Sequence, residues 1–179
     1  MEQSNLEKLY HQHFNKTYRS AYLVTGDHQL AEDAAQEAFL KAFANMEKLR
    51  DIEKFGSWVS VIAANYSIDL LRKKKRMVFT DSIAIHADKN PEASPQDSWE
   101  KIETAQEVRD ALLLLEPDER EILVLKYFND LSIDEIASAI ETPSGTIKSR
   151  LFRARKKMQK LMQPKKQEKR LMNKVSSKL

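Results

Sequence analysis

Residues 131–161 read "LSIDEIASAIETPSGTIKSRLFRARKKMQKL", and this stretch carries the local signals for two helices and a turn between them. Ser132 followed by Glu135 is a capping box, in which each side chain satisfies a free amide in the first turn of a helix. After the interruption "ETPSG" we expect Thr142 as the N-cap and Pro143 as the first residue of a second helix. A short capped helix, followed by a tight turn and a second helix, predicts a helix-turn-helix motif.

The second of these helices combines one apolar stripe with basic residues over most of its remaining surface. Seven of the twenty-one residues 141–161 are Lys or Arg. At 100° per residue, several polar side chains share one face near its start, where a helix-turn-helix enters a major groove. Arginine can bind guanine there, lysine can bind phosphate, and an off-stripe Phe can touch a thymine methyl. The candidates are Thr146, Lys148, Ser149, Arg150, Phe152 and Arg153. The alternative interpretation is a solvated basic helix on an ordinary bundle.

The composition indicates a helical protein without disulfides. The 179 residues include three Gly and no Cys, and helix-forming residues are abundant. The N-terminus has no apolar secretion signal and the apolar runs are far too short to span a membrane, so we expect a soluble intracellular protein. Four scattered His and the lack of a Gly-rich phosphate loop predict no metal site, no cofactor and no enzymatic activity.

Charge is distributed very unevenly along the chain. From residue 141 onward, thirteen Lys or Arg and two Glu give a net charge of +11. The whole chain carries +3, so the first 140 residues carry −8 (3 − 11). This asymmetry suggests two surfaces with different partners, one of them an anion. A basic tail that only keeps the protein soluble is the simpler alternative.

We expect an all-α fold of two small helical domains joined by a flexible linker. Residues 77–98 contain two prolines and no sustained periodicity, which is typical of a linker. Residues 1–76 predict a domain of three or four helices, and 99–162 a helix-turn-helix domain. Residues 163–179 continue as a basic tail, which we expect to be disordered.

The end of the first block places aromatic and polar side chains beside a basic cluster. "FGSWVSVIAANYSIDLLRKKKR", 55–76, contains Trp58, Asn65, Tyr66 and Ser67 ahead of that cluster. Rings that stack on bases and cations that hold the strand are what unpaired nucleic acid requires, and an amide can meet a base edge. A core position for Trp58 and a solvated basic run are the structural alternatives.

A second polar face is predicted upstream, in "EDAAQEAFLKAF", 32–43. Asp33, Gln36 and Glu37 could form an exposed patch that docks a protein surface. The spacing of Asp33, Glu37 and Lys41 equally allows pairing within the helix, worth a few tenths of a kcal/mol. The residues alone leave these two interpretations open.

Taken together, these motifs resemble a bacterial RNA polymerase sigma factor of the extracytoplasmic-function (ECF) group, over about residues 5–162. "AEDAAQEAFLKAF" resembles the core-binding helix of that family. "FGSWVSVIAANYSIDLLRKKKR" resembles its promoter-melting and −10-reading helices, and residues 131–158 its −35-reading helix-turn-helix. The tail after residue 162 runs past the usual end of the family.

The resemblance implies a role for each matched position. It places the grip on the clamp helices of the polymerase at Asp33, Gln36, Glu37 and Phe39. It places Asn65 in the pocket for a flipped base of the −10 element and matches Trp58 to an aromatic of the same helix. The basic cluster adds Arg72, Lys73 and Lys74 as candidates for holding that strand. It places contacts with the −35 element at Lys148, Ser149, Arg150, Phe152 and Arg153, to which the helix geometry adds Thr146. The implied partners are core RNA polymerase, promoter DNA and an anti-sigma factor, which is often membrane-bound in this family.

Two other classes of protein would share some of these features. A conventional helix-turn-helix regulator would form a homodimer and bind DNA tightly without polymerase. A pure protein-interaction module would carry its basic face incidentally. Reconstituted transcription with core polymerase distinguishes all three, because only a sigma factor makes the core enzyme initiate at selected promoters.

Overall fold

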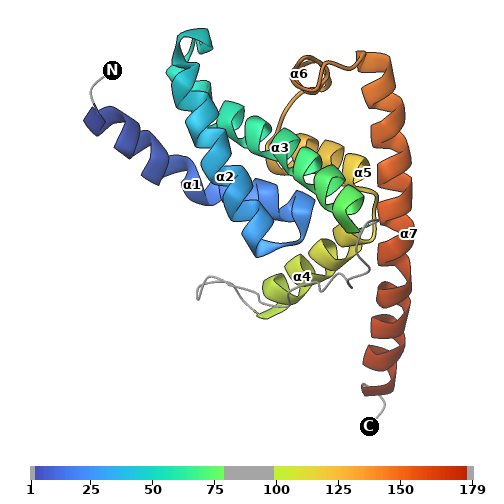
Figure 1. Ribbon diagram of the computed structural model, residues 1–179. Helices are drawn as coiled ribbons and strands as arrows, with labels where there is room; N and C mark the ends of the chain where they lie inside the picture. The colour runs from blue at the N-terminus through green and yellow to red at the C-terminus, as the bar shows by residue number, and fades with distance from the viewer. Residues whose placement is uncertain (1–2, 79–98, 177–179) are drawn as a thin grey trace.

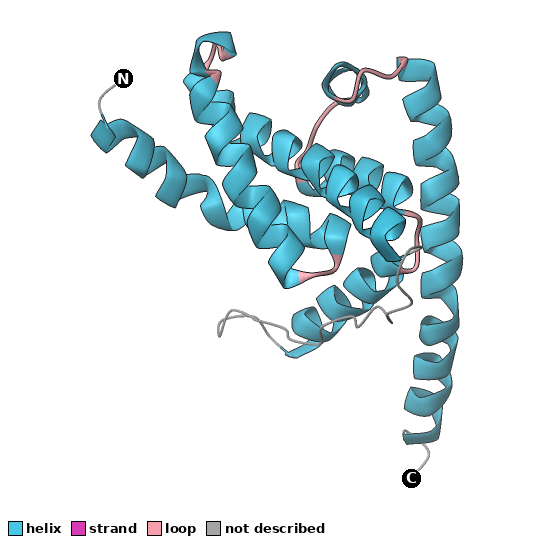
Figure 2. Cartoon of the chain, viewed as in Figure 1, coloured by secondary structure: helices cyan, strands magenta, loops and turns pink. Residues whose placement is uncertain are grey.

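The computed structural model describes residues 3–78 and 99–176, with side chains described within 5–77 and 105–162. Every regular element in those ranges is a helix, which confirms the predicted fold class (Figure 1, Figure 2). The first block contains α1 (Gln3–Thr25), α2 (His28–Ala44), the short turns η1 (Met46–Lys48) and η2 (Ile52–Lys54), and α3 (Phe55–Val78). The second contains α4 (Trp99–Leu113), α5 (Pro117–Leu123), the π-helix η3 (Val124–Phe128), α6 (Ile133–Ala139) and α7 (Ser144–Ser176).

The turn between α1 and α2 contains Gly26 and the helix cap Asp27. Gly26 has a φ of +67°, and its N–H donates to the Tyr22 carbonyl oxygen at 2.8 Å. A Cβ at this position would lie 2.4 Å from a methyl carbon of Leu113 in α4, so Gly suits both the backbone and the close approach. The Asp27 carboxylate then accepts from the Leu30 amide at 3.1 Å and caps α2.

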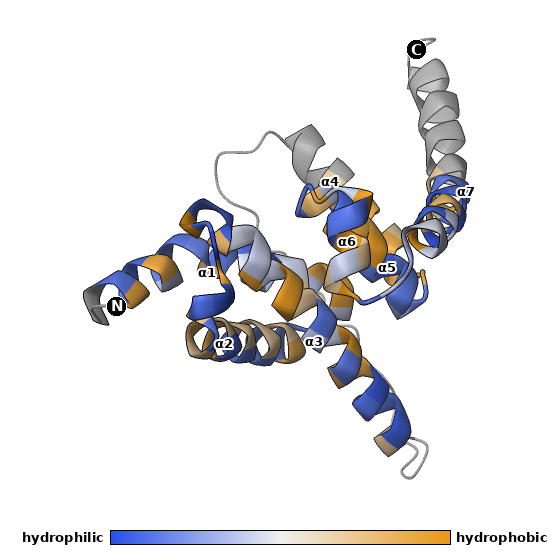
Figure 3. Ribbon diagram, turned by 90° about the horizontal axis from the view of Figure 1, so that it is seen from above, coloured by the Kyte–Doolittle hydropathy of each residue, from blue (hydrophilic) through white to orange (hydrophobic). Residues whose placement is uncertain are grey.

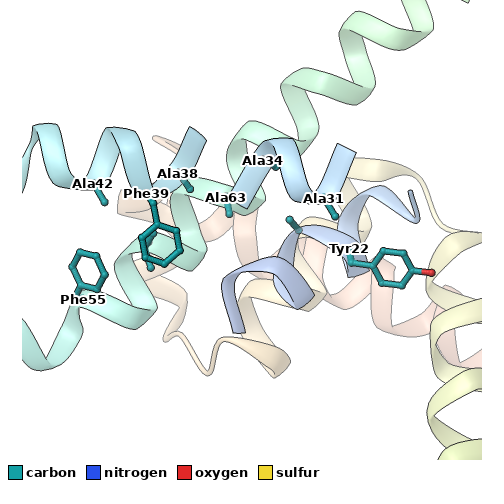
Figure 4. Close-up of a cluster of buried hydrophobic side chains, with 10 residues drawn as sticks. Tyr22, Ala31, Ala34, Ala38, Phe39, Ala42, Phe55 and Ala63 are labelled. Carbon is teal, nitrogen blue, oxygen red and sulfur yellow. The ribbon is translucent and has the colours of Figure 1, made fainter. Parts of the chain in front are cut away.

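The core of the first block is built from small residues on α2 and aromatic residues around them (Figure 4). Ala31, Ala34, Ala38 and Ala42 are fully buried, which lets α2 approach α1 and α3 closely. Phe39 and Phe55 fill the space between the helices, with ring centroids 6.1 Å apart. The buried alanines and Phe39 form the apolar side of α2.

The helix-turn-helix forms at the predicted place, with a shift of one residue at its turn. Glu141 adopts a φ of +48° after α6, and the Thr142 hydroxyl donates back to the Ile140 carbonyl oxygen at 3.0 Å. The Pro143 carbonyl oxygen accepts from the Ile147 amide at 3.1 Å, so Pro143 occupies the cap position and α7 begins at Ser144. The expected N-cap at Thr142 is therefore corrected, because its hydroxyl stabilises the turn instead.

The predicted C-terminal tail is helical, and most of the predicted linker lies outside the described residues. Helix α7 continues through Pro164 to Ser176, where we had expected a disordered tail. The residues after Pro164 are rich in Lys, Gln, Arg, Leu and Met, whose helix propensity favours continuation. Of the predicted linker 77–98, the first two residues end α3 and the remainder is not described. No helix within the described ranges is long and apolar enough to cross a membrane.

The two blocks pack against each other rather than standing apart. One apolar cluster contains Val24, Val61 and Ile68 of the first block together with Ile136 and Ile147 of the second. Helix α1 contacts α4 and α5, and α3 contacts α5. The C-terminal end of α3 extends away from this shared core and is mainly hydrophilic (Figure 3).

Candidate nucleic-acid interface

Helix α6 is held by the predicted capping box, which fixes the start of the helix-turn-helix. The Ser132 hydroxyl accepts from the Glu135 amide at 3.2 Å, and the Glu135 carboxylate accepts from the Ser132 amide at 2.8 Å. The Ser132 hydroxyl also donates to the Glu135 carboxylate at 2.7 Å, and the bonds from the Ser132 amide and hydroxyl together hold the pKa of Glu135 below its ordinary value. Ile136 and Ile147 are fully buried where α6 packs on α7, so the core sets the placement of α7.

The predicted DNA face of α7 is largely open to solvent. The Phe152 side chain is 66% exposed, although Phe is usually buried in folded proteins. Lys148, Ser149 and Arg153 are exposed, while Thr146 and Arg150 are half-buried. The Lys156 ammonium lies 5.8 Å from the Phe152 ring centroid. The structure therefore brings the six predicted residues together on the early turns of one helix.

The residues predicted for the −10 element lie on α3 in three different environments. Trp58 is half-buried and packs on the first core, with its ring 6.3 Å from Phe55 at an edge-on angle. Asn65 is half-buried, and its amide donates to the Ala139 carbonyl oxygen of α6 at 3.0 Å. Ser67 is buried and donates to the Ala63 carbonyl oxygen, so its hydroxyl does not face a nucleic acid. Among these, Trp58 packs on the first core, and Asn65 contacts α6 with its amide nitrogen while its Oδ1 atom is buried.

The basic cluster at the end of α3 is partly paired with acidic side chains. Arg72 lies 3.3 Å from Asp118 of α5, and Lys74 lies 2.8 Å from Asp27. Burial raises the pKa of Asp27, but hydrogen bonds from Lys74 and the Leu30 amide outweigh it, so the pKa falls below its ordinary value. Lys73 is exposed.

The polar face predicted on α2 is present, with one correction. Asp33 and Gln36 are exposed and Glu37 is half-buried, with Lys41 only 3.5 Å from the Glu37 carboxylate. Phe39, however, is 2% exposed and lies in the first core, because it belongs to the apolar side of the helix. The exposed apolar residue of this face is Leu40, which sequence reasoning missed.

Leu40 could have been found from spacing alone. Residues 33, 36, 37 and 40 follow the i, i+3, i+4, i+7 pattern that places side chains on one side of a helix. Leu40 is 66% exposed at the end of that row. A large apolar side chain beside acidic and amide groups is the composition expected of a docking surface.

Within the described residues, no cluster of His, Asp or Glu has the arrangement of a metal site. The exposed groups support recognition: hydrogen bonds and charge from α7 and α3, and a mixed polar and apolar contact from α2.

Two sequence-family models match the chain in the order of its two blocks. Residues 9–77 match Sigma-70 region 2, and residues 105–158 match Sigma-70, region 4. A helical region 2 followed by a helix-turn-helix region 4 defines the class of sigma factors, the promoter-specificity subunits of bacterial RNA polymerase.

Curated relatives narrow this class. The ECF RNA polymerase sigma factor SigW of Bacillus subtilis is 32% identical over 154 residues, which cover 82% of each chain. The RNA polymerase sigma-H factor of Pseudomonas aeruginosa is 35% identical over 147 residues, 77% of this chain and 76% of its own. The ECF RNA polymerase sigma-E factor of Escherichia coli is 30% identical and is covered to 86%. The chain belongs to the ECF group of sigma factors, which direct transcription initiation and are not enzymes.

Solved structures show the same fold. The sigma factor RpoE in complex with the anti-sigma factor NepR from Bartonella quintana aligns with a TM-score of 0.72 and 24% identity, covering 88% of this chain and 96% of RpoE. CnrH in complex with the cytosolic domain of CnrY aligns with a TM-score of 0.59 and 20% identity, covering 90% and 89%.

Proposed function

We propose that this sigma factor docks on core RNA polymerase through the α2 face, reads the −35 element with α7 and engages the −10 element with α3. The observation that carries the proposal is the capped helix-turn-helix, which presents an exposed basic and aromatic face on the first turns of α7. Because core polymerase works in the cytoplasm, that compartment is the proposed site of action.

In the −35 contact, the exposed Arg153 and the half-buried Arg150 supply the base-reading groups, and Lys148 contacts phosphate. Phe152 supplies an apolar surface for a thymine methyl. This division assigns specificity to the arginines and affinity to the lysine, so the two kinds of substitution should differ in their effect on promoter choice.

In the −10 contact, Asn65 supplies an amide for the edge of an unstacked base, while Lys73 and its basic neighbours hold the strand. We assign Trp58 to packing beneath this surface, since it contacts the first core. The α2 contact with polymerase uses Asp33, Gln36 and Glu37, with Leu40 in place of the buried Phe39.

An anti-sigma factor is the third proposed partner. NepR and the cytosolic domain of CnrY accompany the similar sigma factors RpoE and CnrH in their solved structures. A surface that a partner could cover lies between α4 and α7, where Leu114 is 72% exposed beside Leu161. The acidic side chains Glu107 and Asp110 border it, which favours a basic partner segment.

Reconstituted transcription tests the main proposal. Core polymerase supplied with this chain should initiate at a subset of promoters from its own genome, while core polymerase alone should not. A conventional helix-turn-helix regulator would instead bind its sites as a dimer without polymerase and leave the start-site preference of the core enzyme unchanged. That second outcome would overturn the proposal.

A further inference from the structure

The contact between the two blocks covers groups that the proposed function needs exposed. The Asn65 amide donates to the Ala139 carbonyl oxygen at the end of α6, 3.0 Å away and 74 residues along the chain. Arg72 is paired with Asp118 of α5. Both side chains belong to the proposed −10 surface, so in this arrangement the helix-turn-helix block covers part of that surface.

This arrangement is also too compact to occupy both promoter elements. Elements about 25 base pairs apart lie roughly 85 Å apart along DNA at about 3.4 Å per pair. A compact chain of 179 residues has a radius of gyration of roughly 16 Å, or about 40 Å across. The shared apolar cluster of Val24, Val61, Ile136 and Ile147 must therefore separate before −10 and −35 are held together.

The interface between the two blocks buries polar groups that would form hydrogen bonds with water if the blocks separated. Asn129 is 3% exposed and its amide donates to the Ser20 hydroxyl of α1 at 2.8 Å. The Oδ1 atoms of Asn129 and Asn65 are buried without a hydrogen-bond partner among the described residues. A buried unsatisfied acceptor is unfavourable, and opening would return both oxygens to water.

A carboxyl group is buried at the same interface. Glu121 of α5 is 8% exposed, where α5 packs against α3 and α7. Burial raises its pKa to about 8, and the nearby carboxylates of Asp118 and Asp69 add to the increase. The cations Arg72 of α3 and Arg150 of α7 act in the opposite direction but do not offset it.

The charged side chains on the other elements that contact α5 either make hydrogen bonds elsewhere or are exposed to solvent. In η3, the Lys126 ammonium donates to the Leu131 carbonyl oxygen at 2.8 Å. In α1, Lys16 and Arg19 are exposed. Burial at this interface therefore favours the protonated form of Glu121, and access of water on opening would favour the carboxylate.

We propose that the packed arrangement is a self-inhibited state, in which α6 covers Asn65 and whose stability depends on protonation of Glu121. Closing takes up one proton from solution and opening releases it, so higher pH favours the open, promoter-competent chain. The inhibitory meaning of closure rests on the proposed function, whereas closure itself can be measured on the free protein.

Because the chain contains no Cys, a pair of introduced ones can carry two dyes without further changes. Glu47→Cys and Gln159→Cys replace exposed residues on η1 and α7. Resonance energy transfer between the dyes in the free full-length chain should decrease as pH rises from 6 to 9. Below about pH 8, the ratio of closed to open molecules should change on the order of tenfold per pH unit.

Two variants and one control make this test specific. Glu121→Gln should remain closed across the whole range, since it cannot ionise. Asn65→Asp should raise the ratio of open to closed molecules at pH 7 by about tenfold or more, because a carboxylate would face the Ala139 carbonyl oxygen. Asp110→Asn removes an exposed carboxylate of the same block and should keep the pH response of the parent. Circular dichroism would verify that each variant keeps its helices.

An energy transfer that stays constant with pH in the parent, or an unchanged response in Glu121→Gln, overturns the inference whatever the transcription assay shows. A chain that opens with pH yet never directs initiation refutes the proposed function and leaves the proton-linked closure standing. The two failures are thus distinguishable.

Discussion

Arg153 lies on the exposed side of α7 about two and a half turns after the helix begins. Arg153→Ala removes the fork that can bind guanine and leaves the buried stripe of α7 intact. We expect promoter binding by the polymerase complex to weaken by about 1–3 kcal/mol, with relaxed preference at one base pair of the −35 element. Competition binding with single-base variants of the promoter measures both effects.

Gln159→Ala is the matched control for that substitution. Gln159 is also exposed on α7 but lies six residues further along the helix, beyond the early turns, and carries no charge. It should leave both affinity and preference unchanged. If Arg153→Ala and the parent bind the promoter with equal affinity and equal base preference, Arg153 does not contact a base.

Single residues also show where sequence reasoning succeeds and where it does not. The caps Asp27 and Ser132 were predictable, because a cap depends on its own side chain and an amide two or three residues away. The family resemblance assigns Phe39 to the polymerase contact, whereas the apolar periodicity of α2 predicts the core position that Phe39 occupies. The partner of Asn65 could not be predicted, since a contact over 74 residues leaves no local pattern.

At the scale of elements, α2 separates its two functions by face. The side opposite the row of buried alanines carries Asp33, Gln36 and Glu37. The triple Ala variant should remain folded, because these side chains are outside the core and Ala is the strongest helix former. We expect it to retain less than roughly a tenth of the core polymerase that the parent co-purifies, since the docking groups would be absent. Pull-down with tagged protein at equal concentration measures this.

Glu7→Ala, His11→Ala and Asn15→Ala together provide the control for α2. These exposed residues lie along one side of α1 at i, i+4 and i+8, so they test whether any exposed helix row gives the effect. The control should bind polymerase as the parent does. Full retention by the α2 variant would show that polymerase contacts another surface.

Elements also differ in how far their burial could be predicted. Helices α2 and α7 each carry a single apolar stripe, and the stripe identifies the side that packs. Helix α5 has only seven residues, and Arg120, Glu121, Ile122 and Leu123 are all buried because α1, α3 and α7 contact it. A short helix enclosed on several sides has no polar face that periodicity could recognise.

At the scale of the whole molecule, the buried carboxyl of Glu121 links global stability to pH. Its pKa is raised from its ordinary value to about 8 in the folded chain, so between these two values the folded chain binds more protons than the unfolded chain. The free energy of unfolding should therefore decrease as pH rises through this window and level off above it, by at most about 1.4 kcal/mol per pH unit. Glu121→Gln abolishes this decrease and should be more stable than the parent at pH 9, while differing little at pH 4. Urea denaturation of both proteins at pH 4, 7 and 9 measures the effect, and parallel curves for the two proteins across that range would show that Glu121 ionises equally in the folded and unfolded states.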